Sequence, residues 1–116
     1  MKKAIFEMGE SSVKLPMPVY IVNGASIAGT KEGQGPLGSC IDHVLTDDQF
    51  GADSWEAAEC KLQKETVAIL LKKTEVSEKE IRYLFAGDLL GQSMASSFGL
   101  ASYEIPYFCL LYTSDA

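Results

Sequence analysis

Short apolar stretches alternate with amphipathic stretches along this chain. Residues 19–22, 81–86 and 105–108 are short runs rich in β-branched and aromatic residues, which are typical of strands. Residues 53–73 have the apolar spacing of a long helix, and residues 93–100 predict a second, shorter one. The order strand, helix, strand, helix, strand predicts an α/β fold with a mainly parallel sheet.

The longest predicted helix spans residues 53–73 and begins with a recognisable cap. Asp53 is followed three residues later by Glu56, the spacing of a capping box. Apolar or packing side chains recur at helical spacing at Trp55, Ala58, Leu62, Thr66 and Ile69. Residues 67–71 are apolar nearly all round, so we expect this half of the helix to be deeply buried against the sheet.

Two stretches have no sustained periodicity, residues 1–18 and residues 30–53. The first is a mixed lead-in that two prolines close, and the second is a glycine-rich loop. Between Lys31 and Lys61 the chain carries no basic residue, but it carries the acids Glu32, Asp42, Asp47, Asp48, Asp53, Glu56 and Glu59. Their spacing lacks the alternation of a calcium loop, so we interpret the stretch as a solvated acidic loop. After the helix, residues 77–80 match the S-x-x-E capping box and predict a short helical turn.

Length, net charge, cysteine content and the lengths of the apolar runs exclude several classes of function. A length of 116 residues fits one domain, and a net charge of −6 argues against a nucleic-acid backbone as the main partner. Three scattered cysteines without a C-x-x-C pair predict a reducing compartment and provide no zinc site. The longest apolar runs fall far short of a membrane span, so we expect a cytosolic protein whose membrane contact is peripheral.

Asp88 is the best polar candidate for a ligand site. It directly follows the predicted strand 81–86, and ligand sites of open α/β sheets lie outside the carboxyl ends of the strands. Gln92 lies on the same segment. The alternative is that Asp88 caps the following helix or turn. No cofactor, metal or catalytic residue is assigned, because residues 24–31 lack the Gly-Lys-Ser/Thr order of a phosphate loop.

Two further residues, His43 and Cys40, carry no assigned chemistry. His43 lies beside Asp42, but neighbours along a strand point to opposite faces, so a structural role is favoured over a dyad. Cys40 lies in the glycine-rich loop without a cationic neighbour, and Cys60 within the long helix is expected to pack as a small hydrophobe.

Four collinear segments resemble the stage V sporulation protein AD family, which is thiolase-like and similar to ketoacyl synthases. They are residues 22–29, residues 31–38, residues 54–59 and residues 86–92. The second contains EGQGPLG, the third together with Asp53 contains DSWE, and the fourth contains AGDLL. The resemblance implies the N-terminal part of a thiolase-like layered α-β-α sandwich that this chain leaves incomplete. Residues 1–18 are then a lead-in and residues 19–108 a partial domain.

The resemblance also implies a function in a spore-forming bacterium. The family is expected to bind dipicolinic acid as its calcium chelate and to help load it into the forespore, with Asp88 and Gln92 bordering the pocket. Implied partners are integral membrane proteins of the same apparatus, and a second copy in a full-length homodimer. The expected location is the cytoplasm, peripheral to the forespore membrane. The alternative is a fragment of an enzyme, a thiolase-like acyltransferase or a ketoacyl-synthase-type condensing enzyme.

The resemblance fails at Cys109. In the family, the strand that begins near Ile105 continues into a Gly-Ala-Cys-Ser segment, whose cysteine matches the thiolase nucleophile. Cys109 comes too early and lacks these flanking residues, so the nucleophile is not assigned to it. Residues 109–116 instead resemble the translation of a transposon adapter used in sequencing libraries, and we expect a non-native tail.

This interpretation makes a prediction about DNA. The codons for residues 109–116 should match adapter sequence, because the family pattern is good up to Phe108 and fails abruptly after it. Reading the underlying DNA measures this directly. Codons that differ from adapter sequence would show that the tail has another origin.

Overall fold

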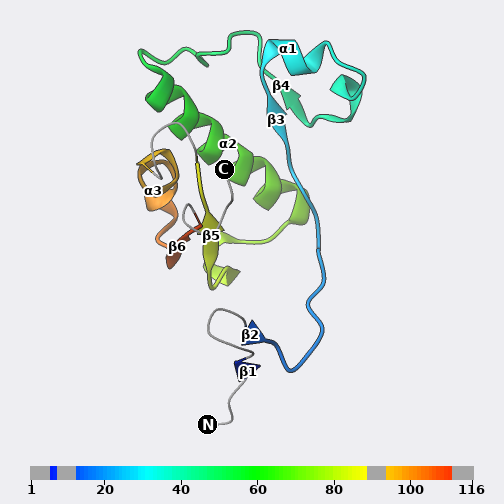
Figure 1. Ribbon diagram of the computed structural model, residues 1–116, viewed down its shortest axis with the longest axis vertical. Coiled ribbons are helices and arrows are strands. Elements are labelled where there is room, and N and C mark those ends of the chain that lie inside the picture. The colour runs from blue at the N-terminus through cyan, green and yellow to red at the C-terminus, as the bar shows by residue number, and fades with distance from the viewer. Residues whose placement is uncertain (1–5, 8–12, 89–93, 111–116) are drawn as a thin grey trace.

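The computed structural model describes residues 6–7, 13–88 and 94–110, and it is elongated, with extents of 50 × 28 × 28 Å. Figure 1 shows α1 at one end of the molecule, the β1–β2 pair at the other, and α2 between them. In chain order the elements are β1 Phe6–Glu7, β2 Val13–Lys14, β3 Ile27–Ala28, α1 Thr30–Gly33, η1 Gly38–Cys40, β4 His43–Val44, α2 Trp55–Thr74, η2 Glu78–Glu80, β5 Leu84–Ala86, α3 Met94–Leu100, η3 Ala101–Tyr103 and β6 Tyr107–Cys109.

Within the described residues, the strands form three separate pairs. β1 and β2 are antiparallel, whereas β3 pairs with β4, and β5 with β6, in parallel. In the last pair Leu84 lies opposite Tyr107 and Ala86 opposite Cys109. Helix α3 packs against α2. The mixture of helices with short parallel sheets confirms the α/β class.

The cap of helix α2 lies one residue later than the sequence predicts. Ser54 has an extended backbone, and its hydroxyl accepts a hydrogen bond from the Ala57 amide at 3.1 Å. The prediction of Asp53 as the cap is therefore wrong, because Ser54 occupies the position next to the first helical turn. At the other end Glu75 adopts a left-handed conformation with φ 54° and closes the last turn.

The apolar half of α2 is less buried than expected. Ala58 is the one residue of α2 that is buried, whereas residues 67–71 are half-buried or exposed. The expectation of deep burial is therefore wrong for this chain. The physical reason is the small area of the sheets, since β5 and β6 contribute three residues each and cannot cover five turns of helix.

Residues 19–22 form no strand, contrary to the prediction. They lie outside every strand pair of the described chain, and their side chains are exposed, with Ile21 at 95%. Strand propensity is realised only where a partner strand accepts the backbone hydrogen bonds, and here none lies alongside. The neighbouring segment does pair, because Ile27–Ala28 forms β3.

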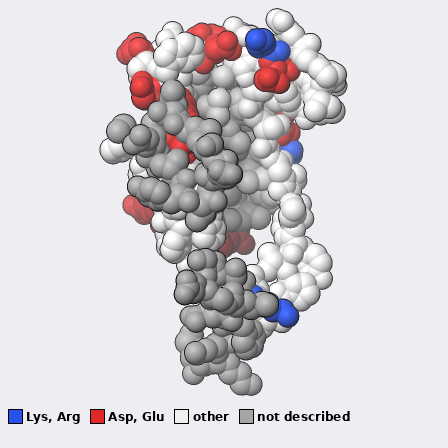
Figure 2. Space-filling model, in the orientation of Figure 1, with Lys and Arg blue, Asp and Glu red and all other residues white. Residues whose placement is uncertain are grey.

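Residues 30–53 are more ordered than a loop. They contain α1, η1 and β4, and Asp48 fixes the start of α1 by accepting hydrogen bonds from the Thr30 amide at 2.8 Å and its hydroxyl at 3.0 Å. Side-chain bonds of this kind leave no periodic signal in the sequence. Figure 2 shows acidic side chains gathered at this end of the molecule. Residues 1–18 also contain the antiparallel β1–β2 pair, which the sequence did not predict.

Three other local predictions are confirmed. Ser77 and Glu80 form the capping box of η2, with the Ser77 amide donating to Glu80 Oε2 at 2.8 Å. The predicted helix 93–100 corresponds to α3, Met94–Leu100. The predicted strand 105–108 corresponds to β6, which begins two residues later and comprises Tyr107–Cys109. The predicted strand 81–86 is shorter in the structure, where β5 comprises Leu84–Ala86.

The cap of α2 can be tested by substitution. Ser54→Ala should lower the free energy of unfolding by about 1 kcal/mol, because the Ala57 amide loses its acceptor. Asp53→Ala is the matched control and should change it by less than about 0.5 kcal/mol. Urea unfolding followed by circular dichroism measures both. A larger loss of unfolding free energy in the Asp53→Ala variant would show that Asp53, and not Ser54, caps the helix.

Candidate functional site

Asp88 lies two residues after β5 and is buried, with 7% of its surface exposed. Its Oδ1 accepts two hydrogen bonds from Ser96, one from the amide at 3.2 Å and one from the hydroxyl at 2.6 Å. Ser96 is the third residue of α3, so its amide has no partner within the helix. Asp88 therefore caps α3, which is the alternative that the sequence left open.

Tyr107 of β6 extends this arrangement. Its hydroxyl lies 2.7 Å from the Ser96 hydroxyl, and Ser96 is fully buried. An ionised carboxylate only accepts, so the Ser96 proton points to Asp88 and the Tyr107 hydroxyl donates to Ser96. The Ala86 carbonyl, at 3.5 Å from the Tyr107 hydroxyl, is the weaker alternative acceptor. These contacts join β5, α3 and β6.

Sequence reasoning found one member of this cluster and missed two. The position of Asp88 after a strand indicates it, whereas no local pattern in the sequence indicates Ser96 or Tyr107. The parallel pairing of β5 with β6 is the signal that could have indicated Tyr107. Gln92, the second predicted ligand residue, lies outside the described residues.

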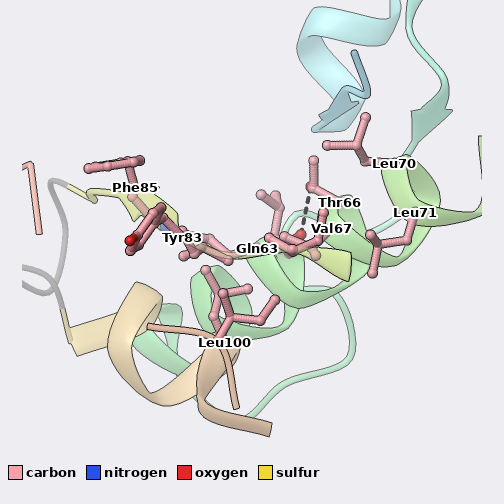
Figure 3. Close-up of a pocket in the computed structure, with 13 residues that line it drawn as sticks. Gln63, Thr66, Val67, Leu70, Leu71, Tyr83, Phe85 and Leu100 are labelled. Atoms are coloured by element: carbon pink, nitrogen blue, oxygen red, sulfur yellow. Dashed lines mark hydrogen bonds between the residues drawn. The ribbon is translucent and has the colours of Figure 1, made fainter. Parts of the chain in front are cut away.

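An apolar cavity of about 460 Å³ lies between α2 and β5 (Figure 3). None of Asp88, Ser96 and Tyr107 lines it. Its lining is Leu62, Gln63, Thr66, Val67, Leu70, Leu71, Ile81, Tyr83, Leu84, Phe85, Ala86, Leu100 and Ile105. The aromatic rings beside it are in contact, since Phe85 stacks on Phe108 with centroids 5.2 Å apart. The lining has no charged side chain, so this cavity suits an apolar group rather than a dicarboxylate.

A polar cluster ties the end of α2 to the segment before β3. Lys73 Nζ donates to Asp42 Oδ1 at 2.7 Å and to the Gly24 carbonyl at 2.8 Å. Asp42 Oδ2 accepts from the Ser26 amide at 2.8 Å. The hydrogen bond from Lys73, and then that from Ser26, hold the pKa of Asp42 below its ordinary value of 3.8. The cluster is exposed, so we interpret it as a structural tether.

The remaining candidates have structural surroundings. His43 is exposed, and its amide donates to the Ser26 carbonyl at 3.2 Å as part of the β3–β4 pairing. Cys40 is exposed, and Cys60 is half-buried at the contact of α2 with Gly99 of α3. Within the described residues, no three histidine, cysteine or acidic side chains gather closely enough to hold a metal ion.

Comparison with known proteins supplies the family. The sequence model of the family named stage V sporulation protein AD (SpoVAD) matches residues 9–115. The chain belongs to this family. Stage V sporulation protein AD of Bacillus subtilis (strain 168) is 33% identical over 93 residues. That alignment covers 80% of this chain and 28% of the relative, so the chain spans less than a third of the relative's length.

Family membership confirms the resemblance on which the sequence analysis relied. The match reaches residue 115, beyond the point where we expect the native sequence to end, and the origin of residues 109–116 stays a prediction. Among the helices of the described residues, none combines the length and the apolar character that crossing a membrane requires.

The buried cluster makes a prediction about stability. Ser96→Ala should lower the free energy of unfolding by about 1–3 kcal/mol, because the buried Asp88 carboxylate loses the hydroxyl that lies 2.6 Å away. Ser102→Ala, at an exposed position of η3, is the control and should stay within about 0.5 kcal/mol of the parent. Chemical unfolding measures both variants. Equal stability of the two variants would mean that the cluster contributes nothing.

Proposed function

We propose that this chain is part of a sporulation protein that binds dipicolinic acid, as its calcium chelate, and helps to load it into the forespore. The observation that carries the proposal is the family match over residues 9–115. It is supported by the collinear segments through which the sequence resembles the family. The protein acts as a binding component rather than as an enzyme.

In this proposal the ligand pocket lies at the carboxyl end of β5. Asp88 borders this pocket with its carboxylate, two residues after the strand. Gln92 follows on the same segment and contributes its amide. The part of the family protein that this chain does not span supplies the other wall, which the 28% coverage of the relative supports.

The proposed fold of the whole protein is a thiolase-like layered α-β-α sandwich. The parallel β5–β6 pair with α2 and α3 packed together supports it, since parallel strands joined through helices occur in sheets with covered faces. The resemblance to thiolase-like proteins also leads us to propose that the full-length protein is a homodimer. The proposed location is the cytoplasm at the forespore membrane, beside integral membrane partners. The net charge of −6 argues against nucleic acid as a partner.

The alternative function is that of an acyltransferase or condensing enzyme with the same fold. The apolar cavity of about 460 Å³ favours this alternative, because an acyl chain is the kind of group that such a lining accommodates. The family-specific segment of residues 31–38, with EGQGPLG, favours the binding function instead. Cys109 of β6 lacks the neighbours of a thiolase nucleophile, so no nucleophile is assigned within this chain.

Calorimetric titration with calcium dipicolinate tests the proposal. A full-length family member carrying this segment should bind, whereas the isolated chain should show no micromolar affinity because most of the pocket is missing. Asp88→Asn in the full-length protein should weaken binding, because the amide oxygen still accepts from Ser96 but the charge is lost.

Each outcome has a separate meaning. A full-length protein that fails to bind would refute the function. Micromolar binding by the isolated chain would show that the pocket lies within these residues. Unchanged affinity of the Asp88→Asn variant would remove Asp88 from the site but leave the function standing.

A further inference from the structure

A groove runs along the contact of α2 with α3 and is open to solvent. It consists of two adjoining hollows of about 190 and 330 Å³, both of which are lined by Ala57, Cys60 and Phe98. It shares no lining residue with the apolar cavity beside β5, so it lies on another side of α2. Figure 1 shows the two helices that form it side by side. The groove is therefore separate from the candidate site at Asp88.

Phe98 lines this groove with 73% of its surface exposed. The side chains beside it are small, namely those of Ala57, Cys60 and Ala95. Gly99 has to be small as well, since a Cβ there would lie 2.6 Å from the Cys60 carbonyl oxygen. Small side chains leave the hollow, and an exposed aromatic ring at its edge is the kind of anchor that protein interfaces use. The centre of the groove therefore suits one apolar side chain of a partner.

The two ends of the groove carry opposite charges. Glu56 lines one end, and Lys61 and Lys64 line the other. Lys61 Nζ lies 4.5 Å from the centre of the Phe50 ring and donates to the Phe50 carbonyl at 3.1 Å, which fixes the position of this charge. Lys64 forms no ion pair within the described part of the chain. In a chain with a net charge of −6, this end of the groove is a positive surface that an acidic group complements.

The spacing of the lining residues along α2 matches that of a second helix. Cys60 and Lys64 are one helical turn apart, which is about 6 Å along the axis at ~1.5 Å per residue. In a helix that lies along α2, an apolar residue and an acid at the i and i+4 positions have the same separation. The whole groove, from Glu56 to Lys64, is about 12 Å long, or roughly two turns. A short amphipathic helix therefore places its apolar side chain beside Phe98 and its acid beside Lys64.

We propose that the groove between α2 and α3 binds an acidic amphipathic helix of a partner protein. An apolar side chain of that helix fills the hollow beside Phe98, and an acidic side chain one turn away pairs with Lys64. The contact is small, so the complex is transient rather than permanent. Glu56 and the net charge of −6 disfavour an extended anionic surface, such as a nucleic acid or a membrane. The proposal does not depend on dipicolinate binding.

Fluorescence anisotropy with a labelled peptide is the first test. The probe is a helical peptide of about 16 residues, built from alanine, leucine and glutamate, with leucine and glutamate at i and i+4. The matched control peptide has lysine in place of each glutamate. The glutamate peptide should bind the 116-residue chain at least about tenfold more tightly than the lysine peptide, because the lysines of the groove repel the latter. The net charge of −6 alone predicts the opposite order, so equal or reversed affinities would overturn the proposal.

Substitutions in the chain locate the binding surface. Phe98→Ala should weaken binding of the glutamate peptide at least about tenfold, and Lys64→Glu at least about fivefold. Leu37→Ala and Lys72→Glu are the matched controls, at exposed positions that do not line the groove, and should stay within about twofold of the parent. All four side chains are exposed, so the variants should keep the fold, which circular dichroism checks. Equal effects of groove and control variants would place the peptide elsewhere and refute the proposal.

Two other occupants of the groove are distinguished by measurements without the peptide. A dimer in sedimentation equilibrium that Phe98→Ala abolishes would assign the groove to a second copy of the chain. Binding to phosphatidylglycerol vesicles that Lys64→Glu abolishes would assign it to a membrane surface. Either result would overturn the proposal of a partner helix, which requires a monomeric chain that leaves such vesicles unbound at the concentrations where the peptide binds.

Discussion

The packing of α3 on α2 is the contact on which the rest of the structure depends. Of the apolar residues buried in the described chain, Ala58, Ala95 and Leu100 lie on these two helices. Gly99 allows the close approach, since a Cβ there would lie 2.6 Å from the Cys60 carbonyl oxygen. Small residues bring the two backbones together, and this places the start of α3 near the ends of β5 and β6.

Polar contacts hold the segments that the apolar core does not reach. The Asp88 cluster joins β5, α3 and β6, and the Lys73 tether joins α2 to the segment before β3. Asp48 does the same for α1. A chain with so few buried apolar side chains relies on such hydrogen bonds for the positions of its elements, although each contributes modestly to stability.

Features that depend on neighbouring residues were predictable from the sequence, and features that depend on distant ones were not. The box at Ser77 and the helix around Ala58 follow from local spacing, and the structure contains both. Residues 19–22 have strand propensity, but a strand also needs a partner, and no local pattern specifies one. For the site, the position of Asp88 after β5 was predictable. Its contact with Ser96 and Tyr107 depends on how β6 and α3 pack, which spacing along the chain does not encode.

The bond between Asp88 and Ser96 has a consequence for any ligand at this edge of the sheet. A single oxygen, Oδ1, receives both the amide and the hydroxyl of Ser96. Turning the carboxylate toward a ligand would break both bonds together and leave the first turn of α3 without its cap. A ligand that drew the Asp88 carboxylate away from Ser96 would therefore be thermodynamically coupled to the local order of α3 and to its contact with α2.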